Sequence, residues 1–144
     1  MWNVMLDRLP NEYKGYPIDS DFQTGIMIYQ VLNDKELTKR ERVATALHLL
    51  FLSEENLPDL KTAEEGLQWF MSGWMTDKHK EKKKTVKVTD YDIDQWRIYS
   101  AFRSQYGIDL NKEKMHFWVF MGLLTTLDEC AYTRVIDIRM KKID

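Results

Sequence analysis

Histidines and a single cysteine are the residues of this 144-residue chain that could hold a metal ion. His48, His79 and His116 are far apart, and none has another His, Cys or carboxylate at the spacing typical of metal ligands. Cys130 stands alone, which is more typical of a small buried apolar residue than of a reactive thiol. We therefore expect neither a metal site nor a bound cofactor.

Acidic residues offer the next candidate for chemistry. Asp90, Asp92 and Asp94 lie two residues apart, which at the start of a helix scatters them round the axis and favours capping over acid/base work. The chain also contains no glycine-rich phosphate loop, no Gly-x-Ser-x-Gly elbow and no His-Glu-x-x-His. The sequence therefore predicts a protein that binds rather than an enzyme.

Lysines crowd the segment from Lys78 to Lys87, in the middle of the chain. Like charges repel one another, and the apolar period vanishes between residues 75 and 87, so we predict a mobile linker there. The alternative is a salt-sensitive contact with nucleic acid phosphates, without base readout. We favour the solvated linker and do not expect nucleic acid to be the partner.

Composition and charge narrow the class of protein. A hydrophobic content of 44% with 31% charged residues fits a helical protein with a real core. The net charge of −2 gives no global field that would concentrate nucleic acid or acidic lipid. The N-terminus lacks the pattern of a signal peptide, and one cysteine suits a reducing compartment, so we expect a cytoplasmic protein without a membrane segment.

The first half of the chain predicts a small β-hairpin followed by three helices. Tyr13 and Tyr16 flank a Lys14-Gly15 turn, and Pro17 suits an edge strand. Asp19, Ser20 or Asp21 can cap a first helix, and capping boxes at Thr38–Glu41 and Thr62–Glu65 open the second and third. The expected buried stripes are Phe22, Ile26, Tyr29 and Leu32; Val43, Ala46, Leu47, Leu50 and Phe51; Leu67, Phe70, Met71 and Trp74.

The second half predicts three more helices, the middle one central to the core. Residues 115–127 are apolar on every side but too few to cross a bilayer, so we expect a buried helix capped by Asn111. Before it, Asp90 or Asp92 caps a helix that ends at Gly107; after it, Asp128 or Glu129 starts the last helix. The expected inward residues are Trp96, Tyr99, Phe102 and Tyr106; Phe117, Phe120 and Leu124; Ala131, Val135 and Ile138.

Together these patterns predict a mainly α protein. We expect a compact bundle of about six helices with a small N-terminal β-hairpin, folded as a single domain over residues 1–144. The hairpin and three helices occupy residues 1–74, the lysine-rich linker residues 75–87, and three helices residues 88–144.

The chain has a surplus of aromatic residues, with five tryptophans and seven tyrosines, and core packing explains most of them. Exposed aromatic side chains often anchor protein interfaces. Trp2, Trp69 and Trp74 lie near element ends or off the main stripes, so they are our candidates for partner-binding residues.

Three segments resemble one known family. They are Y-K-G-Y-P-I-D-S-D-F near the start, F-R-S-Q-Y-G-I-D-L in the middle, and H-F-W-V-F-M-G-L-L-T-T-L followed by V-I-D-I-R. In order and spacing they resemble the gene-product-fifteen family of bacteriophages and prophages of Gram-positive bacteria, over nearly the whole chain.

The resemblance implies a function in phage tail morphogenesis. It suggests a tail assembly chaperone that binds the tape-measure protein, or other tail proteins, in the host bacterial cytoplasm, with several copies of the chain sharing one groove as an open option. The alternative is a structural component of the tail that is retained in the virion.

Overall fold

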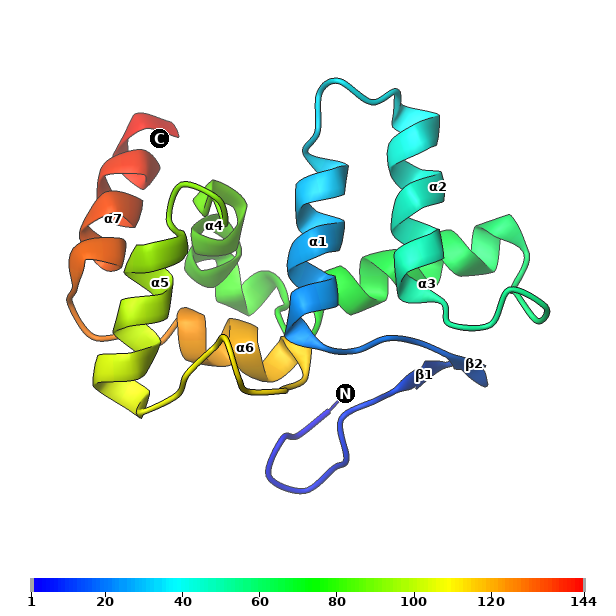
Figure 1. Ribbon diagram of the computed structural model, residues 1–144, viewed down its shortest axis with the longest axis horizontal. Helices are drawn as coiled ribbons and strands as arrows, with labels where there is room; N and C mark the ends of the chain where they lie inside the picture. The colour runs from blue at the N-terminus through cyan, green and yellow to red at the C-terminus, as the bar shows by residue number, and fades with distance from the viewer. Residues whose placement is uncertain (1, 144) are drawn as a thin grey trace. The chain divides into compact units, whose positions relative to one another are not determined.

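The computed structural model describes the backbone of residues 2–143 and the side chains of residues 2–142, and it confirms the mainly α architecture (Figure 1). Seven α-helices occur in this described part, rather than about six. In chain order the elements are β1 (Glu12–Tyr13), β2 (Tyr16–Pro17), α1 (Phe22–Leu32), α2 (Lys39–Leu50), α3 (Leu60–Ser72), the 3-10 turn η1 (Asp77–His79), α4 (Lys80–Val88), α5 (Gln95–Ala101), the π-helical turn η2 (Phe102–Tyr106), α6 (Phe117–Leu124) and α7 (Ala131–Ile143).

The chain divides into two compact units. Unit 1 contains the residues up to Trp74 together with His116–Trp118, and unit 2 contains Met75–Met115 together with the residues from Val119 on. The first boundary falls at the start of the segment expected to be a linker. The single-domain organisation stays a prediction.

The expected hairpin opens unit 1. β1 and β2 pair antiparallel with Tyr13 opposite Tyr16. Lys14 and Gly15 both have positive φ, 49° and 85°, which is the conformation of a tight primed turn between two strands.

Three helices form the rest of unit 1, and α1 and α2 lie side by side (Figure 1). Asp21 caps α1 and Asn33 ends it, as expected. The predicted box at Thr38 and Glu41 is confirmed, with both reciprocal hydrogen bonds present. Local side-chain chemistry therefore places these two helix starts correctly.

Two details of unit 1 differ from expectation. The α1 stripe is Phe22, Gly25 and Ile28, because glycine lets the helix approach its neighbours there, and Ile26 is only half-buried. The second capping box is wrong: α3 begins at Leu60, and Asp59 accepts hydrogen bonds from the backbone N and the hydroxyl of Thr62. A carboxylate three residues earlier thus caps the helix in place of the threonine.

In unit 2, residues 77–88 are helical, although the apolar period vanishes there in the sequence. This segment contacts the rest of the unit: Val86 is buried, and the Thr85 hydroxyl lies 3.8 Å from the sulfur of Met140 in α7. The Thr89 hydroxyl lies 2.7 Å from that of the buried Tyr132. Contacts with a helix some fifty residues later thus outweigh the local lysine repulsion. The mobility of the segment stays a prediction.

The expected starts of the last three helices are also corrected. α5 begins at Gln95, not beside Asp90 or Asp92, and α7 begins at Ala131, not at Asp128 or Glu129. Gly107 has the predicted left-handed conformation, with φ 69° and ψ 19°, and the Ile108 N–H donates to the Phe102 carbonyl.

The central helix is confirmed as core but is shorter than expected. α6 starts at Phe117, and the backbone N–H of Trp118 donates to His116 Nδ1 at 3.0 Å, so His116 and not Asn111 caps it. Phe120 is fully buried, stacked on Phe102 at 5.4 Å between ring centroids. The three residues expected to be buried on α6, Phe117, Phe120 and Leu124, are confirmed, and Trp118 and Met121 are buried beside them.

Candidate partner-binding surfaces

Trp69 and Trp74, two of the predicted binding residues, belong to an aromatic cluster inside unit 1. The ring of Trp69 lies 4.9 Å from that of Tyr13 and 5.2 Å from that of Trp118. The indole N–H of Trp74 donates to the Trp118 carbonyl at 3.1 Å. Both side chains are half-buried, so they also hold unit 1 together, and their binding role stays a prediction.

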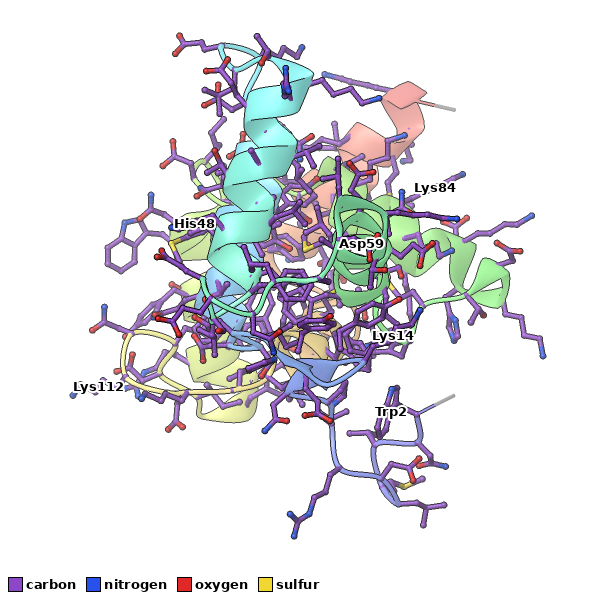
Figure 2. The ribbon with its side chains drawn as sticks, turned by 90° about the vertical axis from the view of Figure 1, so that its right-hand side faces the viewer. Trp2, Lys14, His48, Asp59, Lys84 and Lys112 are labelled. Carbon is purple, nitrogen blue, oxygen red and sulfur yellow. The ribbon has the colours of Figure 1, made fainter. Side chains whose placement is uncertain are left out.

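Trp2 lies in an N-terminal turn, where it is 41% exposed (Figure 2). The turn is closed by Asn3: its backbone N donates to Asp7 Oδ2 at 2.8 Å, and its Oδ1 accepts from the Met5 N–H at 3.0 Å. Three successive apolar side chains point to solvent from this turn, Val4, Met5 and Leu6. Hydrogen bonds thus order a strongly apolar surface, which is unusual without a partner.

A second exposed apolar group, which no sequence pattern indicated, lies between the end of α2 and the start of α3. Leu52, Leu57 and Leu60 are 60%, 53% and 65% exposed. Phe51 and Pro58, from the same connection, are buried instead. No periodic pattern spans an irregular connection, so only the backbone path reveals which side chains face out.

The third exposed group lies in unit 2 and corrects a predicted core residue. Trp96 is 71% exposed, packed edge-on against Tyr99, and Ile93 is 66% exposed one turn earlier. The inward face of α5 carries Ile98 and Ala101 instead. The buried face of α7 also differs from the predicted one: Ala131 and Ile138 are exposed, whereas Tyr132 and Ile136 are buried.

A buried carboxylate explains why α5 turns Trp96 outward. Asp94 is fully buried and accepts two hydrogen bonds from Arg139, at 2.6 and 2.8 Å, and one from Arg97 at 3.0 Å. Burial opposes ionisation, but the hydrogen bonds from Arg139 and from the Asp90 N–H outweigh it and hold the pKa of Asp94 below its ordinary value. The arrangement is an ion-pair cluster that fixes α7 against α5.

The lysine segment presents a basic stripe once it is folded. Lys80, Lys83, Lys84 and Lys87 recur at spacings of three and four along α4, which places them on one face. Lys83 Nζ lies 3.9 Å from Asp77, and Figure 2 marks Lys84 on this helix. A salt-sensitive contact with a polyanion stays the alternative prediction for this stripe.

The three histidines and Asp90, which were the other candidates for chemistry, make contacts that stabilise the local fold. His48 is 3.8 Å from Glu54, His79 Nδ1 accepts from the Thr76 N–H, and His116 caps α6. Asp90 accepts from the backbone N–H groups of residues 92 and 93, so it caps a turn. Within the described residues no three His, Cys, Asp or Glu side chains are grouped to hold a metal ion. No described helix is long and apolar enough to cross a membrane.

The fold and its surface define a small helical protein that presents ordered apolar side chains to solvent. A family model described as Bacteriophage Gp15 protein matches residues 5–144, nearly the whole chain. The protein therefore belongs to this bacteriophage family, as its three sequence segments predicted. No curated protein and no solved structure matches it.

Proposed function

We propose that this phage protein is a tail assembly chaperone that binds the tape-measure protein in the host bacterial cytoplasm. Two lines support the proposal: membership of the Gp15 family, whose resemblance implies a place among tail proteins, and the exposed apolar side chains. A tape-measure protein is expected to be a long helix with apolar stripes, which would associate with itself unless covered.

The observation that carries the proposal is the exposure of large apolar side chains on turns that are already hydrogen-bonded. Such turns lose little conformational freedom on binding, so more of the apolar contact remains as affinity. An apolar surface of this kind suits one face of an amphipathic helix. One small chain covers only a short length of helix, so we expect several copies to bind along one client.

Co-expression tests the proposal. The tape-measure protein should be soluble and co-purify with this chain, and should be insoluble when it is expressed alone. A variant with Met5→Ser and Leu6→Ser tests the exposed apolar turn. Both side chains are over 80% exposed, so the variant should keep its fold but solubilise less client.

Mass spectrometry of purified virions distinguishes a chaperone from a tail component. A chaperone should be absent from mature particles. If the tape-measure protein stays insoluble in both co-expression arms while this chain is found in mature tails, the structural component replaces the chaperone as the function.

A further inference from the structure

We propose that residues 52–60, the connection between α2 and α3 together with the first residue of α3, bind a helix of the client whose apolar stripe is flanked by lysine or arginine. This inference rests on the proposed function and names the site and the chemistry of the client segment. We call residues 52–60 the acidic leucine loop. It contains three exposed leucines and three acidic residues, Glu54, Glu55 and Asp59, and no basic residue.

The acidic leucine loop is held in shape by its own hydrogen bonds. The Leu52 N–H donates to the Pro17 carbonyl at 3.1 Å, and the Asn56 N–H donates to Ser53 Oγ at 3.2 Å. At the far end Asp59 caps α3, and Figure 2 shows it where that helix begins. The leucines are therefore presented by an ordered backbone anchored at both ends.

Burial of other side chains leaves the three leucines outside. Phe51 and Pro58 occupy the inner side of the connection, so Leu52, Leu57 and Leu60 are more than half exposed. Exposed leucines on one short segment favour contact with an apolar surface over contact with water. A partner must therefore supply apolar side chains.

Charge determines which apolar partner fits. Glu54 and Glu55 are exposed, and among the described residues the only cation within 4 Å of Glu54 is the imidazole of His48, when it is protonated. The pKa of Asp59 is lowered by hydrogen bonds from Thr62, so this residue keeps its negative charge. Phosphates would be repelled here. A helix with lysine or arginine beside an apolar stripe complements both the negative charge and the exposed leucines of the loop.

Two synthetic helical peptides with the same leucine stripe test the inference, one flanked by lysines and the other by glutamates. Titration of each fluorescent peptide with the full chain gives affinity, and amide chemical shifts locate the contact. The lysine peptide should bind at least tenfold more tightly than the glutamate peptide and shift amides of residues 52–60. Equal binding, no binding, or shifts confined to Ile93 and Trp96 would overturn the proposal.

Charge reversal sharpens the test. Glu54→Lys with Glu55→Lys should weaken the lysine peptide at least tenfold and improve the glutamate peptide, whereas Glu113→Lys, exposed in unit 2, should change neither. Leu57→Ser with Leu60→Ser should weaken both peptides, whereas Ile93→Ser with Trp96→Ser should not. Because all these side chains are exposed, circular dichroism should show every variant folded.

Other occupants give different results. If the loop variants instead dissociate a dimer of the chain in sedimentation and neither peptide binds, the loop is an interface between copies and the proposal fails. If wild-type chain solubilises the tape-measure protein and the loop variants do so equally well, the inference fails while the proposed function stands. If the lysine peptide binds the loop but the chain does not solubilise the tape-measure protein, the proposed function fails while the binding site for a basic, apolar helix stands.

Discussion

Gly25 shows how one residue can determine the closeness of two elements. It lies in the interior of α1, and a Cβ atom built there would overlap the ring of Phe117, at the start of α6. Both residues belong to unit 1. The glycine therefore serves packing, because no turn or positive φ requires it.

We predict that Gly25→Ala destabilises the protein by about 1 to 3 kcal/mol, the usual cost of overpacking. Helix propensity alone would make alanine more stable by ~1 kcal/mol, so the sign separates the two effects. Urea unfolding of the two proteins measures this change in the free energy of unfolding. A gain in stability would show that the Phe117 ring moves aside without cost.

His116 joins two segments through both ring nitrogens. Nδ1 accepts from the Trp118 N–H, so Nε2 carries the proton and donates to the Pro10 carbonyl at 2.7 Å. Burial lowers the pKa of His116, and the hydrogen bond with Pro10 only partly opposes this. Protonation would place a hydrogen on the nitrogen that caps α6.

We predict that stability falls as the pH drops below about 6.5, the ordinary histidine value. The folded state holds this proton less tightly than the unfolded state, so the stabilisation is present above the unfolded pKa and is lost as pH falls. Urea unfolding between pH 8 and 5 should show the slope. His116→Gln should flatten it, whereas His48→Gln, a change of an exposed residue, should not.

At the scale of elements, the position of α7 depends on one ion-pair cluster. Arg139 contacts the Val88 carbonyl and the buried Asp94, and thereby links α7 to the end of α4 and to α5. Burial makes the cluster vulnerable, because a carboxylate out of water needs its partners.

Replacing Arg139 by methionine should cost about 3 to 5 kcal/mol, because Asp94 is left buried with only the partly exposed Arg97 opposite it. Arg134→Met is a matched control on the same helix. Its pair with Glu129 is exposed at 3.4 Å, so the loss should stay below about 1 kcal/mol. Equal melting temperatures for the two variants would contradict a structural role for the cluster.

The helical order of α4 predicts where trypsin acts first. Proteases need an extended backbone, so we expect early cuts at Lys112 and Lys114, which are exposed in the connection before α6. Lys82, Lys83 and Lys84 should be cut later. The sequence alone predicts the opposite order, with the first cuts in a mobile segment at residues 75–87. Mass spectrometry of the first fragments distinguishes the two predictions.

At the scale of the whole molecule, unit 1 is not continuous in sequence. Residues 116–118 complete it: Trp118 Nε1 donates to the Phe70 carbonyl at 2.9 Å, and the Phe117 N–H donates to the Ser20 carbonyl at 2.8 Å. Removing them would open the aromatic cluster and leave the Phe70 carbonyl without this donor.

A fragment of residues 1–74 should therefore fail to fold alone. We expect weak helical circular dichroism and no cooperative melting, in contrast with the full chain. A peptide of residues 112–124 added to the fragment should restore part of the signal. A fully helical, cooperatively melting fragment would show that residues 116–118 are dispensable to unit 1.

Local chemistry determined much of this fold from the sequence alone. The Lys14-Gly15 turn, the Thr38 capping box and the left-handed Gly107 each depend on residues only a few positions apart. The buried face of α6 was also predictable, because eight apolar residues in a row leave no side that prefers water.

Only the tertiary structure decided that Asp94 lies inside and Trp96 outside, that the lysine segment is helical, and that His116 caps α6. The partners that decide these features are far away in the chain: Arg139 lies 45 residues from Asp94, and Met140 lies 55 from Thr85. The exposure of the leucines in the acidic leucine loop was also decided by the tertiary structure. These leucines face solvent because Phe51 and Pro58 occupy the buried side of the connection. Local propensity cannot register such contacts, because their free energy appears only when distant segments meet.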